Sequence, residues 1–423
     1  MALGNTHRHE PGIDKALLII LLVIALRPIL DLSGRLEDSA SGVNLGAIVG
    51  VLVTVASLLT VLMSRRRSSG QRLTLLLLAF IALLLVIHAM TLQLGLLNLS
   101  AGIRALVALG PAPALLILTM QPRETVQRLS RAFLGVYLAA TFVPVVVAVA
   151  QVLGVVPFQY FDVLADGTVV GRATGGYAQP NSLGRLMIVV VIWGWATLGN
   201  TRLAVTSAIL GFGFLGLLVS SHRTSLLIGV MVVLIAVAAT VSKERWRQRA
   251  RVLGISTLLI AGVAALGLTI GTGFLRTPPP LSDYFADWGN AMIAGFETLS
   301  PDAADDGAFL RGRGWRWERT ISLILDAPLD EQLLGRGEAK VESHNDLLHN
   351  ILVFGVLGTA VIYGILLAFA RVVLVSSQGH GRLLALLFFI AFALYAIPLH
   401  PTEYPSFMWH LMASSVLLNR GFR

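Results

Sequence analysis

Residues Leu203–Ser220 have the sequence LAVTSAILGFGFLGLLVS, an apolar stretch without a charged side chain. A second long apolar run covers Leu73–Leu92. Runs of about 20 apolar residues are long enough to cross a bilayer as helices. The whole chain of 423 residues agrees, because 56% of it is hydrophobic and only 13% is charged, whereas a soluble domain carries roughly 25% charged residues. The sequence therefore predicts an all-α integral membrane protein.

Twelve stretches are candidate membrane spans. They lie near residues 16–30, 43–63, 73–93, 103–120, 132–153, 182–199, 203–220, 225–241, 253–271, 349–370, 383–399 and 404–418. The first stretch lacks a small-residue cleavage site and ends in Arg27–Asp31, so it is predicted to be a retained span and not a signal peptide. No repeat or soluble second domain interrupts the pattern, so residues 1–423 are predicted to form a single polytopic membrane domain.

The connections between the spans alternate in charge. One set is basic, as at Arg65–Arg67 and Lys243–Arg251, and the positive-inside rule places it on the cytoplasmic side together with both termini. The other set includes a long outer loop, about residues 272–348 between spans nine and ten, with seven Lys or Arg against thirteen Asp or Glu. This opposite charge balance supports the outer assignment. Within the loop, residues 315–325 have apolar side chains at helical spacing, which predicts an amphipathic helix on the outer membrane face.

Composition also excludes several kinds of site. The net charge of +9 is carried by short clusters between apolar spans, as topology signals are, so no nucleic-acid partner is expected. The chain has no cysteine, which excludes disulfides and thiolate metal sites. No Asp-x-Asp or clustered-histidine pattern indicates a metal, and no cofactor is expected.

Two polar patches on the predicted outer side precede apolar spans. The first, Arg172–Asn181, combines an arginine with glycines that let backbone approach a ligand, and with a helix start that attracts anions. An ordinary glycine-rich turn explains it equally well. The second, Ser221–Ser225, places Arg223 on the side that the positive-inside rule disfavours. That position favours a functional role, although an arginine at a span end can also snorkel to the interface.

Two further patches belong to the long loop. Guanidinium groups such as Arg313, within Arg311–Trp317, bind phosphate in a forked geometry, but an interfacial helix also uses them to bind lipid headgroups. The segment Ser343–Asn350 opens span ten and contains His344, a side chain that can take a proton near neutral pH. Asn345 or Asp346 could equally be the helix N-cap there.

Taken in order, these patches resemble the O-antigen ligase and polymerase superfamily of bacterial membrane glycosyltransferases. The matching text is Arg172-x-x-Gly175-x-Tyr177-x-x-Pro180-Asn181, Ser-x-Arg-Thr-Ser at Ser221–Ser225, Gly312-Arg313-x-x-x-Trp317, Leu-Leu-Gly at Leu333–Gly335, His344-Asn345-Asp346-x-Leu348 and Phe354-Gly355-x-Leu357-Gly358. The resemblance covers roughly residues 170–370. The chain departs from the commonest pattern at His222, between the serine and the arginine, and at the paired glycines before Tyr177, and neither change removes a charged group.

The resemblance implies a many-helix, GT-C-like fold with a cavity on the outer face of the bacterial plasma membrane. There the enzyme would move a glycan from an undecaprenyl diphosphate carrier to an acceptor sugar, with inversion and without a metal. In such an enzyme His344 would be the catalytic base, and Arg172 and Arg223 would bind the diphosphate. Further substrate contacts would come from Arg313, Arg336, Tyr177, Asn181 and Asn345.

Three activities remain open. The His344-Asn345-Asp346-x-Leu348 block favours a polymerase that joins lipid-linked repeat units. The alternative is a ligase that passes the glycan to lipid A core. A transporter or flippase of lipid-linked glycan is more remote, because charges in the middle of spans would be expected there, and polar groups instead gather on one face.

Overall fold

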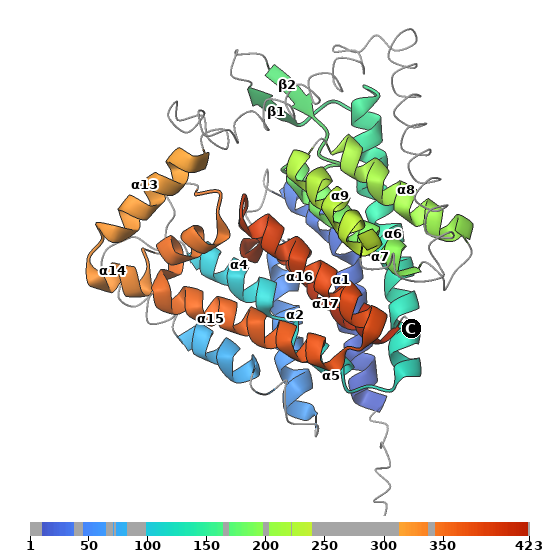
Figure 1. Ribbon diagram of the computed structural model, residues 1–423, viewed down its shortest axis with the longest axis horizontal. Helices are drawn as coiled ribbons and strands as arrows, with labels where there is room; N and C mark the ends of the chain where they lie inside the picture. The colour runs from blue at the N-terminus through green and yellow to red at the C-terminus, as the bar shows by residue number, and fades with distance from the viewer. Residues whose placement is uncertain are drawn as a thin grey trace, which may run out of the picture.

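The computed structural model describes residues 11–37, 45–64, 71, 73–82, 99–163, 169–197, 203–220, 222–238, 313–336 and 343–421 (Figure 1). The ninth predicted span, 253–271, and most of the long loop lie outside these residues. What is described is almost entirely helical, which confirms the all-α class.

The elements follow one another along the chain from α1 to α17. The first group is α1 (Pro11–Glu37), α2 (Leu45–Met63), α4 (Leu99–Leu109), α5 (Ala112–Leu118), α6 (Arg123–Val152), β1 (Tyr160–Val163) and β2 (Val169–Arg172). The second is α7 (Pro180–Thr197), α8 (Leu203–Val219), α9 (Arg223–Ala238), α13 (Arg313–Leu325) and α14 (Leu329–Leu334). The last is α15 (Asp346–Ser376), α16 (Gly379–Ala396), the 3₁₀ turn η3 (Pro401–Glu403) and α17 (Pro405–Gly421).

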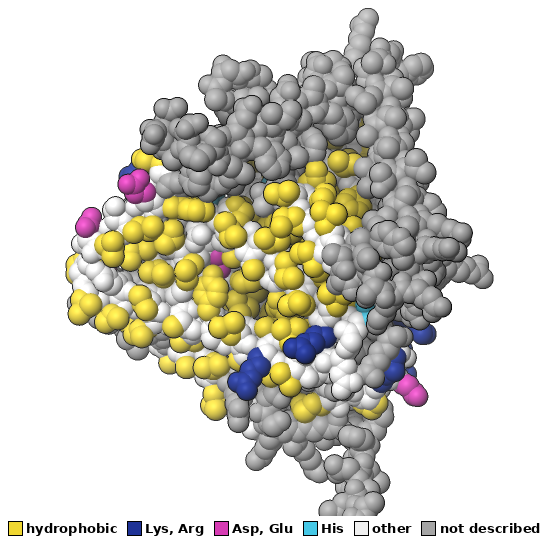
Figure 2. Space-filling model, viewed as in Figure 1, with side chains coloured by type: hydrophobic (Ala, Val, Ile, Leu, Met, Phe, Trp, Pro, Cys, Tyr) yellow, Lys and Arg dark blue, Asp and Glu magenta, His cyan; other side chains and the backbone are white. Residues whose placement is uncertain are grey.

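Within the described part of the chain, four helices are long and apolar enough to cross a membrane, namely α2, α6, α15 and α16. Shorter apolar helices cover Leu73–Ala82, Gly102–Leu118, Ala204–Val219 and Thr224–Ala236. Figure 2 shows hydrophobic side chains spread over the face that α15 and α16 form, with most of the visible Lys and Arg side chains near its lower edge. These features support a membrane-embedded protein, while the count of twelve spans and their orientation stay predictions.

Two local features differ from the predicted spans. The span expected at 103–120 is divided into α4 and α5 at Gly110 and Pro111, because proline cannot donate a backbone hydrogen bond. The chain packs tightly at this break, since a Cβ on Gly110 would lie 2.0 Å from Thr54 Oγ1. The connection after α6 contains an antiparallel hairpin, β1–β2, in which Tyr160 pairs with Arg172. The hairpin lies at the upper edge of Figure 1, beyond the ends of the helices.

Helix α7 forms the centre of the bundle. Every residue from Leu183 to Thr197 is buried, so this helix is covered on all sides. It packs against α8, α9 and α17, and Trp193 Nε1 donates a hydrogen bond of 2.8 Å to Ser414 Oγ on α17. A side chain carried by α7 is therefore held by a rigid support.

Two glycines join the long loop to α15. Gly335, after α14, and Gly355, inside α15, have φ values of 85° and 64°. A Cβ on Gly335 would lie 2.3 Å from Val353 O, and one on Gly355 would lie 2.2 Å from Leu333 O, so the two backbones touch. The amide of Arg336 donates to Leu352 O at 2.9 Å. Two of the motifs that carry the resemblance are thus in direct contact, and they dock α14 onto α15.

The predicted amphipathic helix of the long loop is present as α13. Its apolar side chains Trp315, Ile321 and Leu325 are exposed, as expected for a helix that covers another apolar surface. Its position on the outer membrane face stays a prediction.

Candidate functional site

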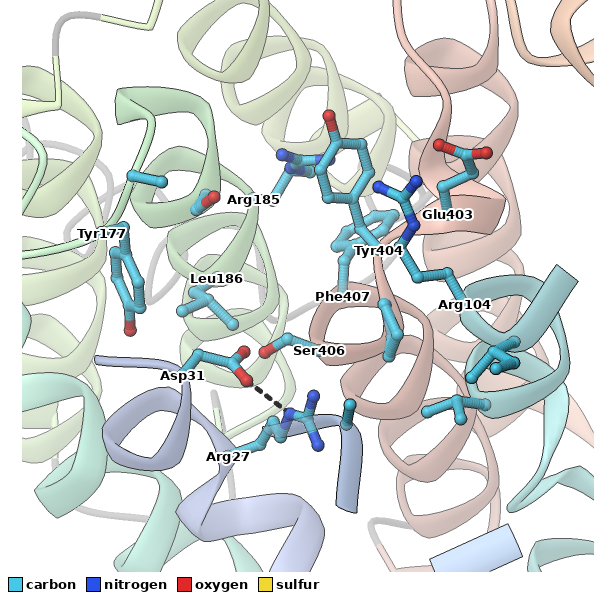
Figure 3. Close-up of a pocket in the computed structure, with 16 residues that line it drawn as sticks. Arg27, Asp31, Arg104, Tyr177, Arg185, Leu186, Glu403, Tyr404, Ser406 and Phe407 are labelled. Atoms are coloured by element: carbon cyan, nitrogen blue, oxygen red, sulfur yellow. Dashed lines mark ion pairs between the residues drawn. The ribbon is translucent and has the colours of Figure 1, made fainter. Parts of the chain in front are cut away.

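A cavity of about 390 Å³ lies among α1, α4, the starts of α2, α7 and α17, and the turn η3 (Figure 3). Such a volume is typical of small-molecule sites. Its charged and aromatic lining includes Arg27, Asp31, Arg104, Tyr177, Arg185, Glu403 and Tyr404, and we call it the Arg185 cavity. The helix ends that line it all fall on the side that the charge pattern places outside.

Arg27 is held within the protein by an ion pair, a backbone hydrogen bond and a ring contact, although its Nε makes no hydrogen bond of regular geometry among the described residues. Its Nε lies 2.5 Å from Asp31 Oδ1, its NH1 donates to Gly46 O at 2.8 Å, and its guanidinium carbon lies 4.7 Å from the centroid of the Trp409 ring. Figure 3 shows this ion pair at one end of the cavity and Arg185 with Tyr404 at the other. The Arg27–Asp31 pair therefore supplies shape and polarity with little net charge.

Arg185 is different, although it is only 1% exposed. Its Nε donates to Asn181 O at 3.1 Å, and its guanidinium carbon lies 3.4 Å from the centroid of the Tyr404 ring. NH1 and NH2 have no hydrogen-bond partner among the described residues. A desolvated cation–π contact contributes roughly 2 kcal/mol, whereas burying an ion costs several kcal/mol. The cavity therefore favours an anion at these two nitrogens.

The glycine-rich turn after β2 has a mainly structural backbone. Gly175 and Gly176 have φ values of 65° and 89°, and a Cβ on Gly175 would lie 2.5 Å from Pro144 O. The amides of Thr174 and Gly175 donate to Gln151 Oε1 at 2.9 and 3.0 Å, so they are not offered to a ligand. These contacts favour the ordinary-turn interpretation of the glycines themselves.

The two candidate substrate-binding residues at the end of this turn lie close to the cavity. Tyr177 lines it and donates from its hydroxyl to Pro28 O at 2.8 Å. Asn181 is the second residue of α7, and its buried Oδ1 has no partner in the described part of the structure. Arg172 ends β2 opposite Tyr160, is partly buried, and is not part of the lining.

Three histidines, His344, His349 and His400, form a second polar group beside the cavity, which we call the histidine cluster. The rings of His344 and His400 lie 6.2 Å apart, and those of His349 and His400 lie 4.2 Å apart. His349 Nε2 lies 2.7 Å from Glu403 Oε1, and Glu403 also lines the cavity. The cluster therefore connects the predicted catalytic base with the wall of the Arg185 cavity.

Burial and neighbouring charges lower the pKa values of both His400 and Glu403. Burial, together with the neighbouring His349 and His344, lowers the pKa of His400 to about 2, which keeps this ring neutral. Burial alone would raise the pKa of Glu403, but the hydrogen bond from His349 and the charges of His349 and Arg104 lower it. Glu403 is thus a carboxylate that faces both the cavity and the cluster.

His344 has an unusual backbone for a non-glycine residue, with φ at 48°. Its Nε2 contacts NH1 of Arg316 on α13. The long loop therefore delivers an arginine directly to the predicted base, although the sequence could not say which of its arginines would do so.

Asn345 and Asp346 hold the start of α15 in place. Asn345 Oδ1 accepts from Leu348 N at 3.1 Å, so Asn345 is the N-cap, and its Nδ2 donates to Ile397 O at 3.3 Å. The buried Asp346 accepts hydrogen bonds of 2.7 Å from Thr402 Oγ1 on η3. Both side-chain ends of Asn345 are thus used structurally, which favours capping over the predicted substrate contact.

The structure describes the side chain of only one of the three remaining predicted arginines. Arg223 begins α9 and Arg313 begins α13, and their side chains lie outside the described residues. The start of α9 is nevertheless close to α7, because a Cβ on Gly184 would lie 2.4 Å from Ser225 Oγ. Arg336 Nε pairs with Glu331 at 2.6 Å, and both side chains are about one-third exposed.

Several residues of this region were not among the sequence candidates, chiefly Arg104, Arg185, His349, His400 and Glu403. Arg185 did carry a signal, because a charged residue inside an apolar span is costly and is most often functional. His349 lies within the candidate segment Ser343–Asn350, whereas Arg104, His400 and Glu403 could not be found from sequence, because they lie on separate segments that only the fold brings together.

No group of three or more His, Cys, Asp or Glu side chains is placed to hold a metal ion in the described ranges. The arrangement can bind an anion and accept a proton. When the chain was compared with known proteins, no family model and no curated protein matched it.

Proposed function

We propose that this protein is a membrane glycosyltransferase of the plasma membrane. It moves a glycan from an undecaprenyl-diphosphate carrier to an acceptor sugar on the outer face, as a polymerase of lipid-linked repeat units. A ligase that transfers to lipid A core is the second candidate.

One observation carries the proposal, namely the contact between the Arg185 cavity and the histidine cluster through η3. Glu403 lines the cavity and bonds His349, whose ring lies 4.2 Å from that of His400, the neighbour of His344. Glycosyl transfer needs a site for the glycan beside a base, because the acceptor hydroxyl must lose a proton.

The proposed reaction is a single displacement at the anomeric carbon. The acceptor hydroxyl oxygen forms the new bond, and the bond from the anomeric carbon to the diphosphate oxygen breaks. The leaving diphosphate keeps the electron pair and is stabilised by arginines, with Arg172 and Arg223 as first candidates and Arg313 next. His344 takes the hydroxyl proton.

Arg316 sets a condition on this role of His344. Its guanidinium donates a hydrogen bond to Nε2 of the ring. A nitrogen whose lone pair accepts this hydrogen bond cannot take a proton from the acceptor hydroxyl at the same time. Arg316 must therefore turn away before His344 acts through this nitrogen. The anionic donor provides a reason for it to do so, since a diphosphate competes for the guanidinium.

A transporter or flippase is less well supported. Alternating access would place the polar groups near the middle of the membrane. Here they gather at helix ends that the charge pattern assigns to one side.

The test is a reconstituted transfer reaction with purified full-length protein in lipid vesicles and a lipid-diphosphate-linked glycan labelled on its sugar. We expect a ladder of longer glycans on the carrier for a polymerase, and label on lipid A core for a ligase. His344→Ala should reduce transfer by about 10²–10⁴-fold while the donor still binds, because only the proton acceptor is lost.

Each result bears on a separate part of the proposal. Near-normal transfer by His344→Ala would remove His344 from the role of base. Movement of intact donor across the bilayer without any glycan transfer would show that the protein is a flippase and not a glycosyltransferase.

A further inference from the structure

We propose that the Arg185 cavity binds the carboxylate of an acidic sugar residue, a hexuronate, in the glycan that this protein handles. The inference rests on the proposed function in taking a glycan as the ligand. It assigns to Arg185 a role in substrate selection that is separate from the grip on the leaving diphosphate.

The first reason is the balance of charge around the cavity. Its wall carries three arginines, Arg27, Arg104 and Arg185, against two carboxylates, Asp31 and Glu403, so one positive charge is left over. Asp31 lies 2.5 Å from Arg27, and the charge of Arg104 acts on Glu403. Arg185 has no such carboxylate among the described residues. A ligand with one negative charge completes the balance.

The second reason is the geometry of the guanidinium. Hydrogen bonding to Asn181 O fixes Nε, and the Tyr404 ring covers the flat face at 3.4 Å. NH1 and NH2 remain, both buried and unpartnered in the described structure. Two parallel N–H groups from one guanidinium match the two oxygens of a carboxylate.

The third reason separates a sugar acid from a diphosphate. Asn181 is not in the cavity lining, but it lies four residues before Arg185 on the same side of α7, and its Oδ1 is a buried acceptor without a described partner. A sugar hydroxyl next to a carboxylate can donate to it, whereas a diphosphate ester has no hydrogen to donate at neutral pH. The one positive charge left over in the wall balances a carboxylate but not the two charges of a diphosphate.

The test measures binding with the full-length protein in nanodiscs, without donor or acceptor lipid. The probes are the methyl glycoside of glucuronic acid, methyl glucoside and inorganic pyrophosphate, each titrated by calorimetry. We expect the uronate to bind and the other two not to bind. Arg185→Met should weaken uronate binding roughly tenfold to hundredfold, because a hydrogen-bonded ion pair is lost. Arg382→Gln, an exposed arginine at the other end of the bundle, should leave binding unchanged.

The melting temperature of Arg185→Met shows whether a loss of uronate binding comes from misfolding. Replacing an unpaired buried charge by an apolar side chain should raise the melting temperature of the ligand-free protein. A lower melting temperature for Arg185→Met would mean that NH1 and NH2 already have an anionic partner in the ligand-free protein, and would overturn the proposal. Preferential binding of pyrophosphate, or equal binding of methyl glucoside, would overturn it as well. Since no transfer is measured, loss of the glycosyltransferase proposal alone would leave these binding results intact.

Discussion

The Arg185 cavity and the histidine cluster touch at η3 but are built in different ways. The cavity is formed by helix ends, and its central arginine stands on α7, which is buried on all sides. The histidine cluster depends on the long loop, because Arg316 reaches His344 from α13, a helix whose apolar face is exposed. A fixed cavity beside a loop-supplied contact is the arrangement expected where one substrate is held while another part of the site opens and closes.

The Arg185 cavity is the preorganised part of the site. In the cavity, the cation is held by Asn181 O and the Tyr404 ring before any ligand arrives. In the cluster, the base is covered by Arg316 and has a strained backbone. Changes to the loop should therefore affect transfer without affecting binding in the cavity.

The largest effect is expected from Gly355→Ala, which breaks the docking of α14 on α15. A Cβ at this position would meet Leu333 O at 2.2 Å, and φ is 64°, so we expect a loss of about 2–5 kcal/mol in stability. Transfer should fall with it, while uronate binding in the cavity should persist below the melting temperature. Thermal unfolding and calorimetry measure the two effects.

Gly364→Ala is the matched control for this variant. It lies on the same helix, and a Cβ there meets nothing within 4 Å, so the substitution should be neutral or slightly stabilising. Equal loss of cavity binding and of transfer in Gly355→Ala would show that the two regions depend on one another. It would contradict a cavity that is fixed independently of the long loop.

A smaller effect is expected from pH, and it reports on His400, which joins the two regions. Its pKa in the folded protein is about 2, below the ordinary value of 6.5, so the folded state favours the neutral ring. The corresponding stability is complete above pH 6.5 and is lost as the pH falls below that value. Between pH 7 and pH 5 the loss should be roughly 2 kcal/mol. The contribution of Glu403 changes only at lower pH, because its pKa lies below the ordinary 4.5.

His400→Gln should remove this pH dependence, measured as the melting temperature at pH 7 and pH 5. His380→Gln on α16, away from the cluster, is the control and should retain it. An unchanged dependence in His400→Gln would mean that another group is responsible for it.

The smallest effect is expected from Arg336→Gln. Arg336 pairs with Glu331 across a partly exposed surface, and such pairs contribute at most about 1 kcal/mol. Transfer should therefore fall only slightly. A loss as large as that of His344→Ala would show that Arg336 leaves Glu331 for the substrate, as the sequence resemblance implied.

The sequence predicted much of the fold and part of the site. The apolar spans, the amphipathic helix at α13 and the position of His344 at the start of α15 followed from local patterns. The break between α4 and α5 did not, although Gly110-Pro111 is visible in the chain, because long apolar runs dominate a hydropathy window. Hydropathy places Arg185 at the end of a span. A sequence does not show that its side chain is buried or that its terminal nitrogens lack a partner.

Composition alone indicated a helical membrane protein, because the bilayer requires apolar helices. The charge pattern predicts which helix ends belong to one side. The tertiary structure alone decided which arginines are already satisfied and which is not. Arg27 finds Asp31 and Arg336 finds Glu331, whereas the terminal nitrogens of Arg185 find no described partner. Pairing of buried charge depends on distances between segments far apart in the chain, and only packing sets those distances.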